Sequence, residues 1–323
     1  MPIVKPSKLK VPFFQFNGHL QTIVPSAKRK IEDVNYQRQR VELKDGDFLD
    51  LDWSITDNDS ERVVIISHGL EGGADRHYCK GIAKIFNEKG WDALAWNCRS
   101  CSGELNRLPR FYHHGDVIDF DVVVEEARKK GYKKIAFVGF SMGGAILMNA
   151  LGTPEFNKEN IVGGVAISTP IELQPSSDEL EKRTKRIYNQ KFFKKLKAKV
   201  IAKSKIMRGI DTTPLLDESF KTLRDFDEAY TAPLHGFENA AEFYHQASVQ
   251  RRIHNIQHPV LILNAKNDPF LTKESYPVEF ASQSDYISLE IPKKGGHVGF
   301  SIVNSDFTYA ELRALSFIQK ISL

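Results

Sequence analysis

The chain has 323 residues, of which 41% are hydrophobic and 27% are charged, and its formal net charge at pH 7 is +4. This balance is typical of a globular protein that can bury a core of several layers, and so small a net charge, without any nucleic-acid-binding motif, argues against a nucleic-acid partner. The sequence has no run of about 20 apolar residues, which excludes a membrane-spanning helix, and the expected location is the cytoplasm.

The first predicted element in chain order is a β-hairpin. Apolar and polar residues alternate over residues 41–43 and again over 49–53, and Asp45-Gly46 between them is a typical tight turn. After the hairpin, short apolar runs alternate with segments of helical periodicity. The expected strands are residues 63–66, 92–96, 135–138, 162–167, 260–263 and 287–291, and the expected helices are 78–89, 116–130, a helix that begins after residue 141, and 307–321. This alternation predicts an α/β fold, with a mostly parallel central sheet covered by helices on both faces, in one domain that spans residues 1–323.

The alternation of strands and helices is interrupted over residues 171–258. This stretch has no strand pattern and is rich in Lys, Glu, Phe and Tyr at helical spacing. An insertion between two strands of a parallel sheet usually lies over their carboxyl ends, where ligands bind, so we expect a mainly helical cap insertion above the site. Its apolar residues are expected to line a pocket for an acyl group, and the alternative is ordinary packing against the domain. They are Phe192, Phe193, Leu196 and Val200, followed by Phe237, Phe243 and Tyr244.

Part of this insertion, residues 182–208, is strongly basic. It holds 12 Lys and Arg residues, with apolar residues between them, so one helix face could be basic and the other apolar. A helix of this kind can lie on an anionic bilayer, which predicts peripheral membrane contact through the cap. The alternative is a solvated lysine-rich face whose apolar side packs on the domain.

A catalytic serine is indicated at Ser141, within Gly139-Phe140-Ser141-Met142-Gly143. This G-x-S-x-G motif lies between an apolar strand and an apolar helix, which is the setting in which the serine hydroxyl is exposed on a sharp turn above a sheet. A serine nucleophile needs a base, and the base needs a carboxylate that orients it. The alternative for Ser141 is a helix-capping serine at a glycine-rich helix start.

The base and the acid are predicted from their positions relative to the last strands. His297 follows the last predicted strand in a glycine-rich loop and precedes the last helix, so we predict that it is the base. Asp268 follows the strand 260–263, which makes it the predicted acid, although it could be a simple turn residue. The resulting order of serine, acid and histidine is the one expected for a nucleophile of this type. The oxyanion donors are expected to be the backbone N–H groups of Met142 and Leu70.

The sequence argues against cofactor chemistry. The loop at 68–73 is glycine-rich but has neither of the phosphate-binding patterns expected of nucleotide sites. Cys98 and Cys101 form a C-x-x-C without a second pair, so they are predicted to be structural thiols rather than zinc ligands. No metal and no organic cofactor are expected.

With these residues assigned, the chain resembles the YheT-like branch of the α/β-hydrolases, a group of predicted esterases and lipases. The resemblance covers nearly the whole chain. It rests on the segments 18–22 (GHLQT), 45–53 (DGDFLDLDW), 68–72 (HGLEG), 99–104 (RSCSGE), 139–143 (GFSMG), 264–270 (NAKNDPF) and 295–300 (GGHVGF). The resemblance implies the α/β-hydrolase fold and ester hydrolysis.

The chain departs from the pattern of this branch at two positions. Relatives often carry two consecutive acids before the proline at 269, whereas this chain has Asn267 and then Asp268, so only Asp268 can serve as the acid. Ser100 stands where the branch tends to have glycine, which affects the expected shape of the loop 98–104 but not the triad.

The predicted function is a serine esterase that cleaves short- to medium-chain acyl esters, including lipid-derived ones, through an acyl-enzyme. Ser141 would attack the ester carbonyl, His297 would take its proton, and Asp268 would hold the imidazole. Two alternatives stay open. One is transfer of the acyl group to an alcohol instead of water, and the other is a non-catalytic ligand receptor on a hydrolase scaffold.

Overall fold

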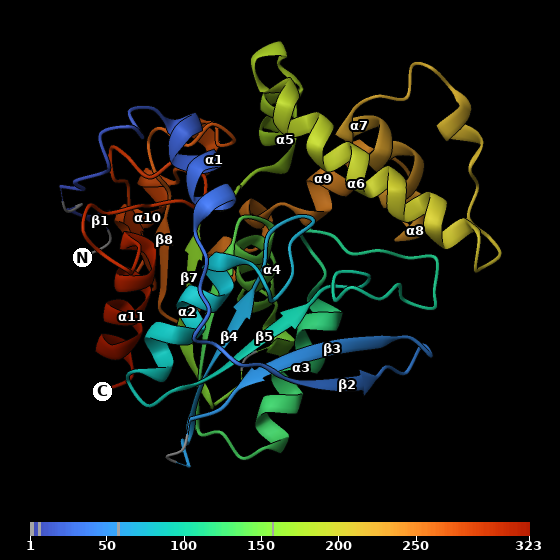
Figure 1. Ribbon diagram of the computed structural model, residues 1–323. Helices are drawn as coiled ribbons and strands as arrows, with labels where there is room; N and C mark the ends of the chain where they lie inside the picture. Colours follow the sequence, from blue (N-terminus) through green and yellow to red (C-terminus); the bar gives the residue numbers. More distant parts are fainter. Residues whose placement is uncertain (1–2, 6–7, 57–58, 157) are drawn as a thin grey trace.

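The computed structural model describes residues 3–5, 8–56, 59–156 and 158–323, and nine strands of these residues form one sheet (Figure 1). The order across the sheet is β1-β9-β8-β7-β6-β4-β5-β3-β2. The strands are β1 (Ile3–Val4), β2 (Gln37–Glu42), β3 (Phe48–Ser54), β4 (Arg62–Ser67), β5 (Asp92–Asn97), β6 (Lys134–Phe140), β7 (Ile161–Ile167), β8 (Val260–Leu263) and β9 (Ile287–Glu290). From β1 to β5 the neighbouring strands pair in parallel, and β3 pairs antiparallel with both β5 and β2. The prediction of a mostly parallel sheet is confirmed.

Helices cover both faces of this sheet, as expected. They are α1 (Gly18–Lys28), α2 (His77–Asn87), α3 (Val117–Lys129), α4 (Met142–Leu151), α10 (Val278–Gln283) and α11 (Tyr309–Ile321). The apolar sides of α3 and α4 form a core on one face, and those of α2 and α11 form a second core on the other. Because both faces are covered, β5 and β8 are buried along their whole length, which explains the continuous apolar sequence of β8 and the apolar residues 93–96 of β5.

The predicted hairpin is formed by β2 and β3, where Val41 pairs with Leu49. Gly46 in its turn has a φ of 85°, a conformation that favours glycine. Among the strands and α-helices outside residues 171–258, three were not predicted. β1 has only two residues, α10 has six, and α1 contains Pro25, so none of them has a long periodic pattern.

The described part of residues 171–258, called here the cap segment, contains helices and turns between β7 and β8. Its helices are α5 (Leu173–Glu181), α6 (Arg186–Ser204), α7 (Leu223–Phe226), α8 (Ala232–Leu234) and α9 (Ala240–Ala247). In Figure 1 these helices lie together above the sheet, on the side toward which β4 and β5 point. Phe193, Leu196 and Val200 of α6 belong to the same apolar core as α3 and α4, so the cap segment is packed on the domain. Within the described ranges, none of the helices combines the length and apolar character needed to cross a bilayer.

Candidate functional site

Ser141 lies on a strained turn between β6 and α4. Its φ is 54° and its ψ is −118°, which is rare for any residue other than glycine and typical of functional sites. The Ser141 N–H donates a hydrogen bond to the carbonyl oxygen of Ile167 on the neighbouring strand, at 2.8 Å. A Cβ added to Gly139 or Gly143 would come within 2.3 Å of a backbone oxygen, of Gly143 and Ser67 respectively, so only glycine fits on either side of this turn.

Asp268 and His297 are in direct contact. His297 Nδ1 lies 2.9 Å from Asp268 Oδ2 and 3.1 Å from Oδ1, and both residues are buried. Asp268 Oδ1 also accepts the Phe270 N–H at 2.8 Å, and the Phe270 ring stacks on the imidazole with 4.1 Å between ring centroids. Because a carboxylate only accepts hydrogen bonds, this contact places the proton of a neutral imidazole on Nδ1 and leaves Nε2 free to accept another proton.

Ser141 and His297 line the same two cavities, which meet at the serine. The inner cavity extends under the cap segment, and most of the side chains that line it are apolar. The outer cavity lies between α1, the start of α2 and α6. The predicted nucleophile, Ser141, and the predicted base, His297, therefore face the same space.

The two predicted oxyanion donors, Leu70 and Met142, also line the inner cavity. Met142 is the first residue of α4, so its N–H has no partner within the helix. The Gly69 carbonyl oxygen lies 2.7 Å from His68 Nδ1 and accepts the Gly72 N–H at 2.9 Å. In a trans peptide the C=O and the following N–H point in opposite directions, so these contacts orient the Leu70 N–H away from His68.

His68 holds this peptide as a neutral imidazole, a role that the sequence analysis missed. The Cys98 N–H donates to His68 Nε2 at 3.1 Å, so the proton of the ring is on Nδ1 and is donated to Gly69. Burial lowers the pKa of His68 to about 4, which keeps the ring neutral near pH 7. The His-Gly pair at 68–69 was the available signal for this role.

Helix α1 holds the loops of the acid and the base together. Gln21 Oε1 accepts the Gly295 N–H at 2.8 Å and the Asn267 side-chain amide at 3.0 Å. Thr22 Oγ1 accepts the His297 N–H at 2.8 Å. The sequence analysis used the motif of residues 18–22 only for the resemblance, and the structure shows that two of its side chains position the base.

Asn267, the first departure from the pattern of the branch, contacts α1 rather than His297. Its Oδ1 accepts the Gly296 N–H at 3.1 Å while its amide group donates to Gln21. Asp268 is therefore the residue of this pair that meets the imidazole. At the second departure, Ser100 has a φ of 61°, which explains why glycine is common there, and its Oγ accepts the Asn106 N–H at 3.1 Å.

The predicted pocket residues of the cap segment divide into two groups. Phe192, Leu196, Phe243 and Tyr244 line the inner cavity, together with Leu180 and Phe226. Phe193 and Val200 pack into the core, and Phe237 packs against Phe243. One half-buried carboxyl, Asp227, also lines the cavity, and it accepts hydrogen bonds from Thr231 Oγ1 at 2.6 Å and Tyr244 OH at 2.8 Å. Burial raises the pKa of Asp227 to about 6.

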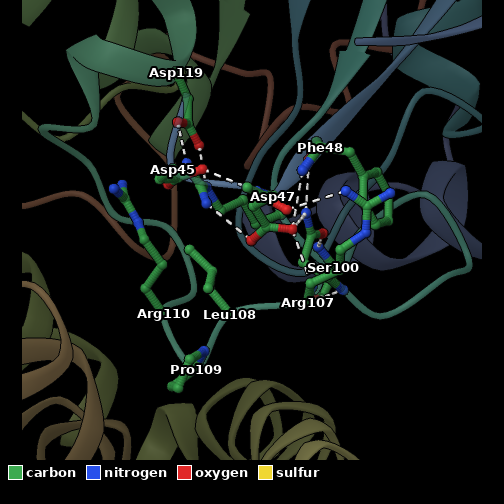
Figure 2. A network of polar contacts seen from close by, with 12 residues as sticks. Asp45, Asp47, Phe48, Ser100, Arg107, Leu108, Pro109, Arg110 and Asp119 are labelled. Carbon is green, nitrogen blue, oxygen red and sulfur yellow. Dashed lines mark hydrogen bonds and ion pairs between the residues drawn. The ribbon is translucent and has the colours of Figure 1, made fainter. Parts of the chain in front are cut away.

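A polar network supports the loop beneath α6 (Figure 2). The buried Arg99 guanidinium forms ion pairs with Asp45, Asp47 and Asp119 at 2.7–2.9 Å. This network anchors the chain that continues through Leu108, Pro109 and Arg110. The Lys203 ammonium of α6 donates to the carbonyl oxygens of Leu108 and Arg110, at 2.6 and 2.8 Å, so the cap segment is attached to this loop.

The basic stretch is not divided into one basic and one apolar face. Lys195, Lys199 and Lys203 lie four residues apart on α6, and each donates a hydrogen bond to the domain, but Lys195 is exposed, Lys199 is half-buried and only Lys203 is buried. Lys195 donates to the Glu71 carbonyl oxygen at 3.2 Å, and Lys199 forms an ion pair with the Glu71 carboxylate at 2.7 Å. The expected separation is wrong for these lysines, because buried backbone oxygens and a buried carboxylate need cationic partners.

One cluster of possible metal ligands was not predicted. The ligand atoms of His113, Asp116 and His235 lie within 4.8 Å of one another. The Gly115 N–H donates to His113 Nδ1 at 3.1 Å, which places the proton of the neutral ring on Nε2, and Arg110 already pairs with Asp116 at 3.0 Å. A protonated nitrogen and a neighbouring guanidinium do not fit a cation, so this cluster is better described as a hydrogen-bonding group beside the inner cavity.

Comparisons with known proteins agree with this geometry. The family model described as serine aminopeptidase, S33 matches residues 58–297. The candidate esterase YheT of Escherichia coli strain K12 is 33% identical over 288 residues, which cover 88% of this chain and 84% of that protein. The monoacylglycerol lipase of Saccharomyces cerevisiae is 29% identical, over 77% of this chain and 57% of that protein. The esterase Pf2001 of Pyrococcus furiosus has a similar fold, with a TM-score of 0.59 and 17% identity over 98% of this chain and 99% of that chain.

Proposed function

The chain belongs to the α/β-hydrolases, in the family described as serine aminopeptidase, S33 and in its YheT-like branch, and from this membership we propose that it is a carboxylic ester hydrolase that works through an acyl-enzyme. The observation that carries the proposal is the arrangement at one cavity: Ser141 on its strained turn and His297 held by Asp268 both line it. The names of the relatives, an esterase and a monoacylglycerol lipase, support an ester as the substrate.

In the proposed reaction, Ser141 Oγ attacks the carbonyl carbon of the ester while its proton passes to His297 Nε2. Asp268 stabilises the imidazolium, and the N–H groups of Leu70 and Met142 bind the negative oxygen. The bond to the alcohol oxygen then breaks, and the alcohol leaves with the proton from His297. Water loses a proton to His297 and attacks the acyl-serine, which releases the carboxylic acid and restores Ser141.

Turnover of p-nitrophenyl esters, from acetate to dodecanoate, tests the proposed function directly. We expect hydrolysis that is fastest for the acyl chains that fill the inner cavity, because burial of each methylene group contributes about 0.8 kcal/mol. Absence of turnover across the whole series by folded protein would contradict the proposal. Product analysis with added alcohol, in the same assay, separates hydrolysis from acyl transfer.

Leu196→Phe should shift this preference toward shorter acyl chains. Leu196 lines the inner cavity, so a larger side chain removes space that the end of a long chain would occupy. We expect kcat/KM for the longest accepted ester to fall by about tenfold or more, with a smaller change for acetate. Ile201→Phe is the matched control, because Ile201 lies on the same helix and is 38% exposed. An unchanged chain-length profile in folded Leu196→Phe would show that the acyl chain binds elsewhere.

Peripheral membrane contact through the cap segment is proposed in a narrower form than the sequence suggested. The exposed cations of this region are Lys182, Arg183, Arg186, Lys191, Lys194, Lys195, Lys205 and Arg208. Exposed isoleucines stand among them, above all Ile187 at 75% and Ile206 at 66% exposure. Each cation near an anionic surface contributes about 1 kcal/mol, and exposed isoleucines can insert between lipids.

Sedimentation with vesicles tests this contact. We expect binding to vesicles that contain an anionic lipid, weaker binding at high salt, and loss of binding in Lys205→Glu/Arg208→Glu. The control is Lys320→Glu, an exposed lysine on α11 outside the cap segment. Binding that is independent of anionic lipid and of salt would mean that these cations are ordinary surface charges.

A further inference from the structure

The outer cavity is the second space that meets Ser141. It shares five lining residues with the inner cavity: Leu70, Ser141, Phe192, Phe270 and His297. The acyl and alcohol parts of an ester lie on opposite sides of the carbonyl carbon that the serine attacks. If the apolar inner cavity holds the acyl chain, the outer cavity is where the alcohol part lies.

The side chains that line the outer cavity carry excess positive charge. Arg76, Lys191 and Lys195 line it, and none of the three forms an ion pair with a carboxylate in the described part of the chain. Glu71 is the one acid among the lining residues that the structure describes. Its carboxylate is already bound by Lys199 at 2.7 Å and by the Tyr112 hydroxyl at 2.6 Å.

The amino end of α2 adds to this positive potential. The helix begins at His77, its N-cap residue Arg76 provides no side-chain cap, and its first turn contains no acid. Unpaired N–H groups at a helix start favour an anion. The Nδ1 atom of His77, which also lines the cavity, is buried without a hydrogen-bond partner among the described residues.

The pKa values of two lining residues agree with an excess of positive charge. Burial lowers the pKa of His77 to about 4, and the positive charges of Arg29 and Arg76 contribute to this decrease. The pKa of Lys195 is also lowered, first by burial and then by the charge of Arg76. An anion in this cavity would relieve the repulsion among these cations.

We propose that the outer cavity binds a phosphate group carried by the alcohol part of the ester, so that the preferred substrate is an acyl ester of a phosphorylated alcohol. This inference rests on the proposed function. A phosphate offers several acceptor oxygens and nearly two negative charges, which match the guanidinium, the two ammonium groups and the helix start that line this cavity. A neutral alcohol would leave these cations without an ion-pair partner among the described residues.

The test compares two substrates with the same acyl chain: 1-hexanoylglycerol and 1-hexanoylglycerol 3-phosphate. With the full wild-type chain at low salt, we expect kcat/KM to be on the order of tenfold higher for the phosphate ester. The ratio of kcat/KM for the phosphate ester to kcat/KM for the neutral ester should fall toward one near 1 M salt, where the Debye length is only about 3 Å. Free glycerol 3-phosphate should inhibit turnover of p-nitrophenyl esters more strongly than glycerol does.

Two charge-reversal variants on α6 distinguish binding of the phosphate in the outer cavity from nonspecific electrostatic attraction of the substrate to the protein. Lys191→Glu should reduce the preference for the phosphate ester by on the order of tenfold. Lys194→Glu should leave the preference within about twofold of wild type, because Lys194 is exposed and lines neither cavity, so any effect would act only through solvent. Both variants change the net charge equally, and their thermal unfolding shows whether they fold alike.

Equal kcat/KM for the two esters, or an equal loss of preference in both variants, would overturn the phosphate site while p-nitrophenyl ester hydrolysis persists. If folded wild-type protein hydrolyses neither these esters nor any p-nitrophenyl ester, the proposed function itself is wrong.

Discussion

Ser141→Ala is expected to lower kcat on p-nitrophenyl esters by about 10⁶-fold, the loss seen when a serine hydrolase is deprived of its nucleophile. Without Oγ, no acyl-enzyme can form, and only the binding and polarising groups are left. The same substitution should abolish labelling by a fluorophosphonate probe, which reacts with serines that a neighbouring base activates. Alanine keeps the Cβ atom at φ 54°, so we expect the backbone of the turn to be retained.

The control for this experiment is Ser282→Ala, at an exposed serine on α10 that lines neither cavity. Its turnover and labelling should match those of the wild type. Circular dichroism of the Ser141→Ala variant shows whether it is folded. Labelling that persists in folded Ser141→Ala would place the nucleophile elsewhere and contradict the mechanism.

Asp268→Asn is expected to lower kcat by about 10⁴-fold, as for the equivalent change in a serine protease. The carboxamide can keep the hydrogen bond from the Phe270 N–H, so the loop should retain its shape. Its amino group, however, can donate to His297 Nδ1, which favours the tautomer with the proton on Nε2. In that tautomer the imidazole cannot accept the proton of Ser141.

The matched control is Asp285→Asn, which removes one carboxylate from an exposed position. We expect its kcat to stay within about twofold of wild type, since isolated surface charges contribute little. A kcat for Asp268→Asn within about tenfold of wild type would show that another carboxylate orients His297.

Local sequence patterns predicted most of the architecture. The strands, the hairpin turn and the long helices depend on residues that are near neighbours in the chain, and their positions in the structure agree with the prediction. Helix α1 was missed because its helical stretch contains Pro25 and few buried apolar residues, and β1 because two residues carry no alternation. The predicted site residues followed from chain order: Ser141 after one strand, Asp268 and His297 after later ones.

Contacts between distant segments were decided only by the tertiary structure. Gln21 and Gly295 are 274 residues apart, and no local pattern shows that one carboxamide holds the loops of both the acid and the base. The same holds for Phe192 and Phe193, adjacent residues of which only the first lines the cavities.

The sequence by itself determined the elements of this protein, the strained turn at Ser141 and the order of the three predicted catalytic residues, because these depend on backbone preferences over a few residues. The tertiary structure decided which groups the lysine side chains of α6 contact. A spacing of four predicts that Lys195, Lys199 and Lys203 share one face of a helix, but it does not say what that face meets. The Glu71 carboxylate lies 128 residues from Lys199, so these lysines contact the domain only because folding brings a buried carboxylate and backbone oxygens to α6.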